Sequence, residues 1–394
     1  MSGKKWYNLI KNMLAKTNYD NPPLTRLIES LLEQGFSEGA SDIYFEPNTN
    51  QMDVSYRIDG DLNNILTLPA KTGIDLISQI KNLSQNGRLE LNTPKNKIIF
   101  SVCLIYTNFG EKIIMRPDNQ REVGLEKISL SLDLLKLIEK NIKESPGMIL
   151  VAGPAGSGKT TLLYKILELL DSPHINISTI EDRIKHPLEN INQSRLNPKI
   201  GYTAAVALRS LLRQDPNIIM ADEINNEEAM KVALQNSAKG RAFLSGLRSS
   251  GDVVNIISDL IKTGMPPELI SSAINLIITQ RLVRRPCGDC LEKYNPDAEE
   301  KEMLNQIIKN NISSQMPFME KLSFYRGRGC GKCHGTGYRG QTSLYETTKM
   351  SPELIESVQK NDGQKKIAEL IKDGLNKASR GETTLAEIFR LAKE

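Results

Sequence analysis

The sequence predicts an α/β protein whose main domain is a parallel sheet with helices on both faces, preceded by a smaller α+β domain. From residue 125 onward, segments with helical periodicity alternate with short apolar segments typical of buried strands. One of these strands, residues 148–152, runs into a glycine-rich turn and then a helix. Another, residues 217–221, is followed by two carboxylates. Because ligands of such sheets bind at the carboxyl ends of the strands, we expect the functional site there.

The first 23 residues carry one weak helical pattern. Trp6, Ile10, Met13 and Leu14 fall at helical spacing among several lysines, and a Pro-Pro pair ends the segment. The pattern predicts an N-terminal helix over residues 1–23. Such an apolar stripe can bind a partner or a membrane surface, or it can pack on its own domain.

The smaller α+β domain is expected over residues 24–119. Its predicted helices cover 24–34 and 73–83, and its predicted strands cover 41–45, 52–57, 62–66, 98–105 and 112–116. Residues 117–120, with the sequence PDNQ, are typical of a linker.

The main domain is expected over residues 120–394. Its predicted helices cover 131–143, 159–170, 203–213 and 226–238, and its predicted strands cover 147–152, 175–180, 217–221 and 241–245. Residues 351–394 are typical of short charged helices.

The glycine-rich turn has the spacing of a phosphate-binding loop. Its residues are Gly153, Pro154, Ala155, Gly156, Ser157, Gly158, Lys159 and Thr160, followed by Thr161. The glycines let successive backbone N–H groups converge on a phosphate at the positive end of the helix. Lys159 can reach the β- and γ-phosphate oxygens, and the Thr160 hydroxyl can ligate Mg²⁺. The turn therefore predicts binding of a nucleoside triphosphate.

Two of the predicted strands end in acidic pairs. Asp222 and Glu223 end one of them, where one carboxylate can join the Mg²⁺ shell and the other can lie near the attacking water. The alternative is a buried strand with two solvated acids at its end. Glu181 and Asp182 end the preceding strand in the same way, and Glu181 is a further candidate catalytic residue.

Arg209 and Arg213 lie one turn apart on the helix predicted for 203–213. They could reach a phosphate across a subunit boundary, or they could be ordinary surface charge. Composition does not choose between these two interpretations.

Four of the five cysteines form two C-x-x-C pairs, Cys287 with Cys290 and Cys330 with Cys333. Four thiolates from two such turns favour a tetrahedral, structural Zn²⁺ site. The intervening segment is long enough for a helix of its own at 298–312, and the zinc-binding insert is expected over 285–340. The fifth, Cys103, is expected to be a small core residue.

Composition limits the choice of partners. The formal net charge of +4 and the aromatic content of 5% leave little electrostatic or stacking surface for nucleic acid, which is therefore not expected as a partner. No apolar run approaches the length of a membrane-spanning helix, so any membrane association is expected to be peripheral.

Over residues 24–394 the ordered motifs resemble the hexameric ATPases of type II secretion and type IV pilus assembly, the GspE/PilB type. Besides the phosphate loop and the C-x-x-C pairs, these motifs are ASDIYFEP (40–47), RIDG (57–60), GEK (110–112), TIED (179–182), LRSLLRQDP (208–216), QRL (280–282) and CGKCHGTGYRG (330–340). The long N-terminal domain that many assembly members carry is missing from this sequence.

The resemblance also implies a domain architecture, an assembly and a partner that the motifs themselves do not indicate. It implies a PAS-like small domain, a RecA-like motor domain, and ATP bound between them with Arg57 and Arg116 closing on the phosphates. It also implies a homo-hexamer in the cytoplasm that acts on a polytopic inner-membrane platform protein of the GspF/PilC type and reaches the membrane through that partner.

Two of the departures from the family pattern bear directly on catalysis. Where the family has its glutamate general base, this chain has Lys185, which cannot accept a proton while charged. Where the family has two histidines, it has Arg241 and Arg248.

Two hypotheses follow from these departures. In one, Glu223 replaces the base, Asp222 and Thr160 hold Mg²⁺, and the two arginines stabilise charge. In the other, the chain binds ATP but turns over slowly, or only within a mixed ring.

Three functions remain open at this point. The first is a motor ATPase for pilus assembly or type II secretion. The second is an ATP-binding ring component with a regulatory or structural role. The third, a nucleic-acid-dependent ATPase with a zinc ribbon, is disfavoured by the small charge excess and the low aromatic content.

Overall fold

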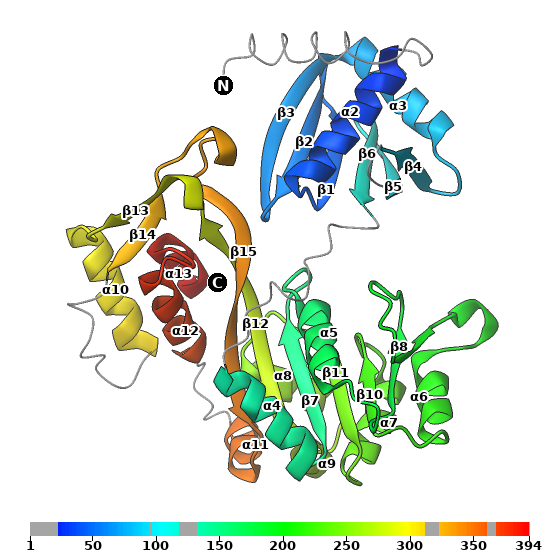
Figure 1. Cartoon of the computed structure of the whole chain (residues 1–394), viewed down its shortest axis with the longest axis vertical. Coiled ribbons are helices and arrows are strands. Elements are labelled where there is room, and N and C mark those ends of the chain that lie inside the picture. Colours follow the sequence, from blue (N-terminus) through cyan, green and yellow to red (C-terminus); the bar gives the residue numbers. More distant parts are fainter. Residues whose placement is uncertain (1–22, 94–96, 118–131, 312–322, 361–367, 394) are drawn as a thin grey trace. The chain divides into compact units, whose positions relative to one another are not determined.

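The computed structural model describes residues 23–93, 97–117, 132–311, 323–360 and 368–393 (Figure 1). The chain divides into two compact units, Met1–Val123 and Gly124–Glu394. The helix predicted for residues 1–23 and most of the linker predicted at 117–120 lie outside the described residues. None of the helices in the described ranges combines the length and apolarity that crossing a membrane requires.

The described part of the first unit is a six-stranded antiparallel sheet with two helices. Its elements are α2 (Pro23–Glu38), β1 (Asp42–Pro47), β2 (Gln51–Ile58), β3 (Asp61–Pro69), α3 (Ala70–Leu83), β4 (Arg88–Asn92), β5 (Lys97–Thr107) and β6 (Gly110–Pro117). The strand order is β3-β2-β1-β6-β5-β4. The predicted helices and strands are confirmed, and β4 is an additional strand that we did not predict.

Both helices of the first unit pack on the same face of its sheet. Alternate strand residues such as Ile43, Phe45, Val54 and Tyr56 are fully buried with the apolar faces of α2 and α3. Cys103, expected in the core, is instead exposed. Its neighbours on β5 alternate between faces, so a thiol on the face away from the helices is not covered.

The second unit is built on a seven-stranded sheet of order β15-β12-β7-β11-β10-β8-β9. Its strands are β7 (Met148–Gly153), β8 (Ile177–Glu181), β9 (Asn192–Arg195), β10 (Ile218–Ala221), β11 (Ala242–Arg248), β12 (Ile274–Pro286) and β15 (Tyr338–Lys349). All neighbouring pairs are parallel except β12 and β15. The predicted parallel sheet is confirmed apart from this edge, where the chain returns from the cysteine-containing segment and runs antiparallel to β12.

Helices cover both faces of this sheet, as predicted. The elements are α4 (Leu132–Glu144), α5 (Lys159–Leu170), α6 (Ala204–Leu212), α7 (Glu227–Ser237), α8 (Val253–Lys262), α9 (Pro267–Ala273) and α11 (Pro352–Gln359). Ile149 and Val151 of β7 pack with the face that carries α4 and α5. Met148, Leu150 and Ala152 alternate with them and pack with α6 to α9 and α11 on the other face. Because each strand buries both sets of side chains, the strands read as continuous apolar runs.

The remaining helices form a separate small core around the far halves of β12 and β15. They are α10 (Ala298–Asn311), α12 (Ala368–Ser379) and α13 (Leu385–Lys393), with the short strands β13 (Leu291–Tyr294) and β14 (Phe324–Gly327) beside them. Val283 of β12 and Leu344 of β15 belong to this core. The helix predicted at 298–312 is thus confirmed, as are the charged helices predicted after residue 351. In Figure 1 these elements lie to the left of β12 and β15.

Candidate nucleotide and metal sites

The phosphate loop lies between the end of β7 and the start of α5, at the carboxyl edge of the sheet. Gly156 and Gly158 have φ angles of +75° and +87°, a backbone conformation that residues other than glycine rarely adopt. A Cβ on Gly153 would lie 2.5 Å from the carbonyl oxygen of Gln280. The glycines are therefore required by backbone conformation at two positions and by space at the third.

Lys159 carries a buried positive charge inside this loop. Its side chain amine donates hydrogen bonds to the carbonyl oxygens of Gly153 and Pro154, both at 3.0 Å. Burial is the main cause that lowers the pKa of Lys159, and the charges of Arg248 and Lys185 lower it further, whereas Glu223 and Asp222 raise it. These four charged side chains therefore lie close enough to Lys159 to interact with its charge.

Three side chains meet at the start of α5. The Thr160 hydroxyl donates to Oδ1 of Asp222 at 2.6 Å, and Nζ of Lys185 donates to the same hydroxyl oxygen at 3.1 Å. A hydroxyl and a carboxylate that converge in this way are the oxygen ligands that Mg²⁺ prefers, so Thr160 and Asp222 fit that metal. The contact with Lys185 was not foreseen, because the segment between β8 and β9 could not be placed from its sequence.

Glu223 and Arg248 form a second charged pair beside the loop. Nε of Arg248 lies 3.4 Å from Oε1 of Glu223, close enough for an ion pair although not aligned as a hydrogen bond. Arg248 pairs in register with Gly153 of the neighbouring strand β7, which brings it level with the phosphate loop. Predicted site residues from three separate segments thus meet at one edge of the sheet.

The side chain of Glu181 contacts residues other than those of the phosphate loop. Its fully buried carboxylate accepts hydrogen bonds from Tyr164, from Thr179 at 2.5 Å and from Gln193 at 3.1 Å. These bonds connect β8 with α5 and β9. Within the described residues, these hydrogen bonds do not extend to the phosphate loop, so the evident role of Glu181 is structural and its catalytic role stays a prediction.

The two arginines at the family's histidine positions are separated by the length of β11. Strands rise about 3.3 Å per residue, which puts the Cα atoms of Arg241 and Arg248 roughly 20 Å apart. Arg241 precedes β11 at the amino edge of the sheet, where it pairs with Asp215 and donates to the Pro216 carbonyl oxygen at 3.3 Å. The charge-stabilising role predicted for Arg241 stays a prediction, and its contacts within this chain lie at the opposite edge of the sheet from the phosphate loop.

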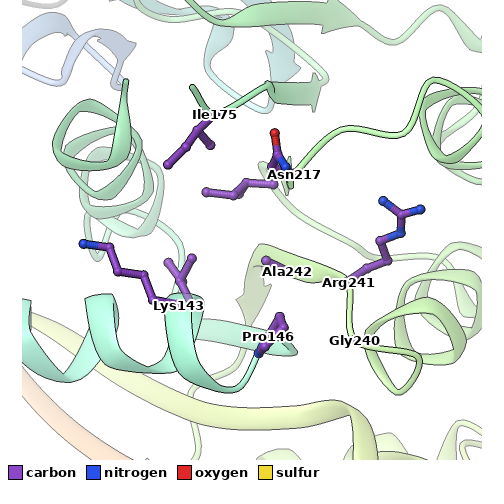
Figure 2. A pocket seen from close by; sticks show the side chains of 9 residues that line it. Lys143, Pro146, Ile175, Asn217, Gly240, Arg241 and Ala242 are labelled. Atoms are coloured by element: carbon purple, nitrogen blue, oxygen red, sulfur yellow. The ribbon is translucent and has the colours of Figure 1, made fainter. Parts of the chain in front are cut away.

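Arg241 instead borders a surface hollow of about 370 Å³. Figure 2 shows its guanidinium on one side and Lys143 on the other, with Asn217 and Pro146 between them. Apolar side chains from α4 and β10 complete the lining.

Arg209 and Arg213 are exposed on or beside α6. Arg209 donates to Glu228 on α7 at 2.7 Å, and Arg213 donates weakly to Ser210 at 3.5 Å. Neither contact involves the phosphate loop, and the prediction that they act across a subunit boundary stays untested.

Arg57 and Arg116 of the first unit lie on either side of Asp42, on the face of the sheet that α2 and α3 leave open. Arg116 donates twice to Oδ1 of Asp42, at 2.9 and 2.6 Å. Arg57 pairs with Asp42 in register and donates to the Tyr44 hydroxyl at 3.1 Å. Their predicted contact with ATP stays a prediction.

Gln280 is a residue of the site that sequence reasoning marked only as part of a motif. It lies on β12, next to β7, and its side chain amide is within 2.9 Å of where a Cβ on Gly158 would be. It is 2% exposed and donates to Ser343 of β15 at 3.1 Å. A polar side chain inside an apolar strand was the available signal, but only the pairing of β12 with β7 places it under the phosphate loop.

The four cysteines predicted to bind metal come together. The Sγ atoms of Cys287 and Cys330 are 4.0 Å apart, those of Cys290 and Cys333 are 3.9 Å apart, and those of Cys330 and Cys333 are 3.7 Å apart. Four ligands at the usual Zn–S distance would be about 3.8 Å from one another in a tetrahedron. The cluster therefore fits Zn²⁺.

The surroundings of the cysteines shift their pKa values in opposite directions. Burial raises the pKa of Cys287 and raises that of Cys290 to about 12. Burial alone would raise the pKa of Cys333, but hydrogen bonds from the backbone amides of Cys330 and Gly337 outweigh it and lower the pKa to about 6. An ion pair between Lys332 and Asp289, at 2.5 Å, joins the two C-x-x-C turns on the outside. The site is closed by protein ligands, as structural zinc sites are.

Comparison with known proteins agrees with this geometry. The model of the family described as "Type II/IV secretion system protein" matches residues 17–390. The chain is 33% identical to the type II secretion system ATPase E of Vibrio cholerae, covering 95% of this chain and 76% of that protein. It is 34% identical to the type IV pilus assembly ATPase PilB of Acinetobacter baylyi, covering 95% of this chain and 67% of that protein.

Solved structures support the fold. The DotB ATPase of Legionella pneumophila aligns over 96% of this chain and 98% of its own, with a TM-score of 0.62 and 18% identity. The pilus retraction motor PilT with bound ADP aligns over 93% and 97%, with a TM-score of 0.53 and 18% identity. On the family match and the identity to its relatives, the chain belongs to the type II/IV secretion system family of ATPases.

Proposed function

We propose that the chain is a motor ATPase that couples ATP hydrolysis to type II protein secretion or type IV pilus assembly. The observation that carries the proposal is the meeting of Lys159, Thr160, Asp222, Glu223 and Arg248 at one edge of the sheet. Relatives named for both processes match the chain with nearly equal identity, so the proposal covers both.

The residues of the site have distinct roles in this proposal. Lys159 and the amides of the phosphate loop bind the phosphates. Thr160 and Asp222 would hold Mg²⁺, which when bound neutralises phosphate charge. Glu223 orients the attacking water and accepts its proton, and Arg248 places a positive charge 3.4 Å from that carboxylate.

The assembly follows from the resemblance to the family. We propose a homo-hexamer in the cytoplasm, peripheral to the inner membrane, that acts on a polytopic platform protein of the GspF/PilC type. The first unit would be the PAS-like domain that presents Arg57 and Arg116 to the nucleotide, and the four cysteines would bind a structural Zn²⁺ in the insert.

A second candidate function is an ATP-binding ring component with impaired hydrolysis. One specific observation favours it. Lys185 stands where the family has its general base, and its ammonium contacts Thr160 at 3.1 Å, so the position is filled by a group that cannot accept a proton. Slow turnover would follow if Glu223 does not replace that base.

Steady-state ATP hydrolysis by the full-length protein distinguishes the two candidates. We would compare wild type with Glu223→Gln and Lys185→Glu, and would check ring formation in the same samples by light scattering. If the motor proposal is right, wild type turns over and Glu223→Gln abolishes turnover while nucleotide still binds. A silent wild type whose activity is restored by Lys185→Glu would establish the second candidate instead.

A further inference from the structure

Lys185 is held against the phosphate loop at two points. Its backbone N–H donates to the Tyr164 hydroxyl at 3.2 Å, and that hydroxyl in turn donates to Glu181. Its side chain then reaches Thr160, where Nζ donates to the hydroxyl oxygen at 3.1 Å. Both Tyr164 and Thr160 belong to α5, so one helix fixes the backbone and the ammonium of Lys185.

The hydroxyl that Lys185 contacts is the predicted metal ligand. Thr160 donates its own proton to Asp222 at 2.6 Å, which leaves its oxygen lone pairs for a cation. Mg²⁺ bound to that oxygen would lie about 2.1 Å from it. The ammonium of Lys185 would therefore lie no more than about 5 Å from a metal ion bound to that oxygen.

The charges around the loop point the same way. Among the side chains that meet at the loop, Lys159, Lys185 and Arg248 are cationic and Asp222 and Glu223 are anionic, which is an excess of one positive charge among these five. This excess of positive charge can bind the phosphates of a nucleotide without a metal ion. The same excess repels a divalent cation that approaches Thr160 and Asp222.

We infer that Lys185 is a built-in cation of the nucleotide site, which weakens the dependence of nucleotide binding on Mg²⁺. The ammonium supplies part of the charge that Mg²⁺ supplies elsewhere, and it opposes binding of the metal beside it. By linkage, both effects reduce the factor by which Mg²⁺ tightens nucleotide binding. The inference rests on the proposed binding of ATP, but not on hydrolysis.

The test is a pair of binding titrations with the full-length protein and methylanthraniloyl-labelled ADP. The dissociation constant is measured once with saturating Mg²⁺ and once with EDTA, and their ratio is the coupling factor. We expect a factor below about 5 for wild type and a factor at least about tenfold larger for Lys185→Gln. Lys185→Arg keeps the charge and should keep the wild-type factor.

A matched control is Lys199→Gln, which removes an equally exposed lysine from the segment between β9 and α6. It should leave the factor unchanged. Because Lys185 is itself exposed, its substitution is not expected to prevent folding.

Two results would overturn the inference, and they are distinguishable. If labelled ADP binds and Lys185→Gln has the wild-type factor, the contact with Thr160 has no role in binding, while the proposed nucleotide site stands. If wild type binds no labelled ADP with or without Mg²⁺, the proposed function fails together with the inference.

Discussion

The two ends of β11 carry the same residue type in very different surroundings. Arg248, at the carboxyl edge, lies beside Glu223 and level with the phosphate loop. Arg241, at the amino edge, pairs with Asp215 and borders the hollow in Figure 2. In the sequence the two arginines cannot be told apart, since both stand at positions where the family resemblance leads us to expect histidine. Strand direction separates them, because all functional loops of a parallel sheet meet at its carboxyl edge.

The largest expected difference between the two ends is in catalysis. Arg248→Ala should lower kcat for ATP by about 10- to 100-fold, since it removes a fixed charge beside the loop and the partner of Glu223. Arg241→Ala should change kcat less than about twofold, which is the scale of a surface substitution. Steady-state ATPase assays on both variants check this.

An equal loss of kcat in Arg248→Ala and Arg241→Ala would contradict the prediction that only Arg248 acts on the nucleotide bound by its own chain. Arg241 would then act on the nucleotide of a neighbouring subunit, and mixing Arg241→Ala with a Lys159→Ala variant should restore part of the activity.

A smaller effect concerns stability near the carboxyl edge. Glu346 of β15 is paired with Thr279 of β12, which lies next to Ala152 at the end of β7. Burial raises the pKa of Glu346 to about 7, the hydrogen bond from Thr279 opposes the shift, and the nearby Asp252 adds to it. The folded protein therefore binds this proton more tightly than the unfolded chain, in which the pKa is about 4.5.

The sign of the pH dependence follows directly. The stabilisation by this proton is fully present below pH 4.5 and is lost as the pH rises through about 7. We expect this group to lower the free energy of unfolding by about 1–3 kcal/mol across that window. Urea unfolding at several pH values measures it, with Glu346→Gln expected to remove the fall and Glu356→Gln, an exposed site on α11, expected to retain it.

The smallest effect is expected at the amino edge. Arg241 and Asp215 form an ion pair whose carboxylate side chain is 76% exposed. Such a pair should contribute less than about 1 kcal/mol. A double-mutant cycle with Arg241→Gln and Asp215→Asn, read by urea unfolding, measures it. Asparagine is chosen because residue 215 has a φ of +56°, which asparagine tolerates.

A coupling energy well above that value would change the comparison. The amino edge would then hold a structural charge pair as important to the protein as the charges at the carboxyl edge.

Much of the fold could be predicted because it depends on residues close in sequence. The helix that starts at Lys159 follows from the glycines before it, and the strands from 148 and 218 follow from continuous apolar runs. The cysteine cluster could be predicted for the same reason, since each C-x-x-C turn presents two thiols from one short segment.

Other parts of the site depend on pairings between distant segments. Gln280 lies under the phosphate loop because β12 pairs with β7, across more than a hundred residues of chain. Glu181 was predicted to be catalytic from its place at the end of a strand, yet its carboxylate is buried by Tyr164 and Gln193. Neither arrangement has a local signature.

The phosphate loop, the acidic strand, the four cysteines and the family could be recognised from the sequence, because the residues of each motif are neighbours along the chain. The position of Arg248 rather than Arg241 beside the loop, and the contact of Lys185 with Thr160, became evident from the folded structure. Those outcomes depend on strand direction and on the path of the segment between β8 and β9. Packing of the whole sheet determines both, and no short motif encodes them.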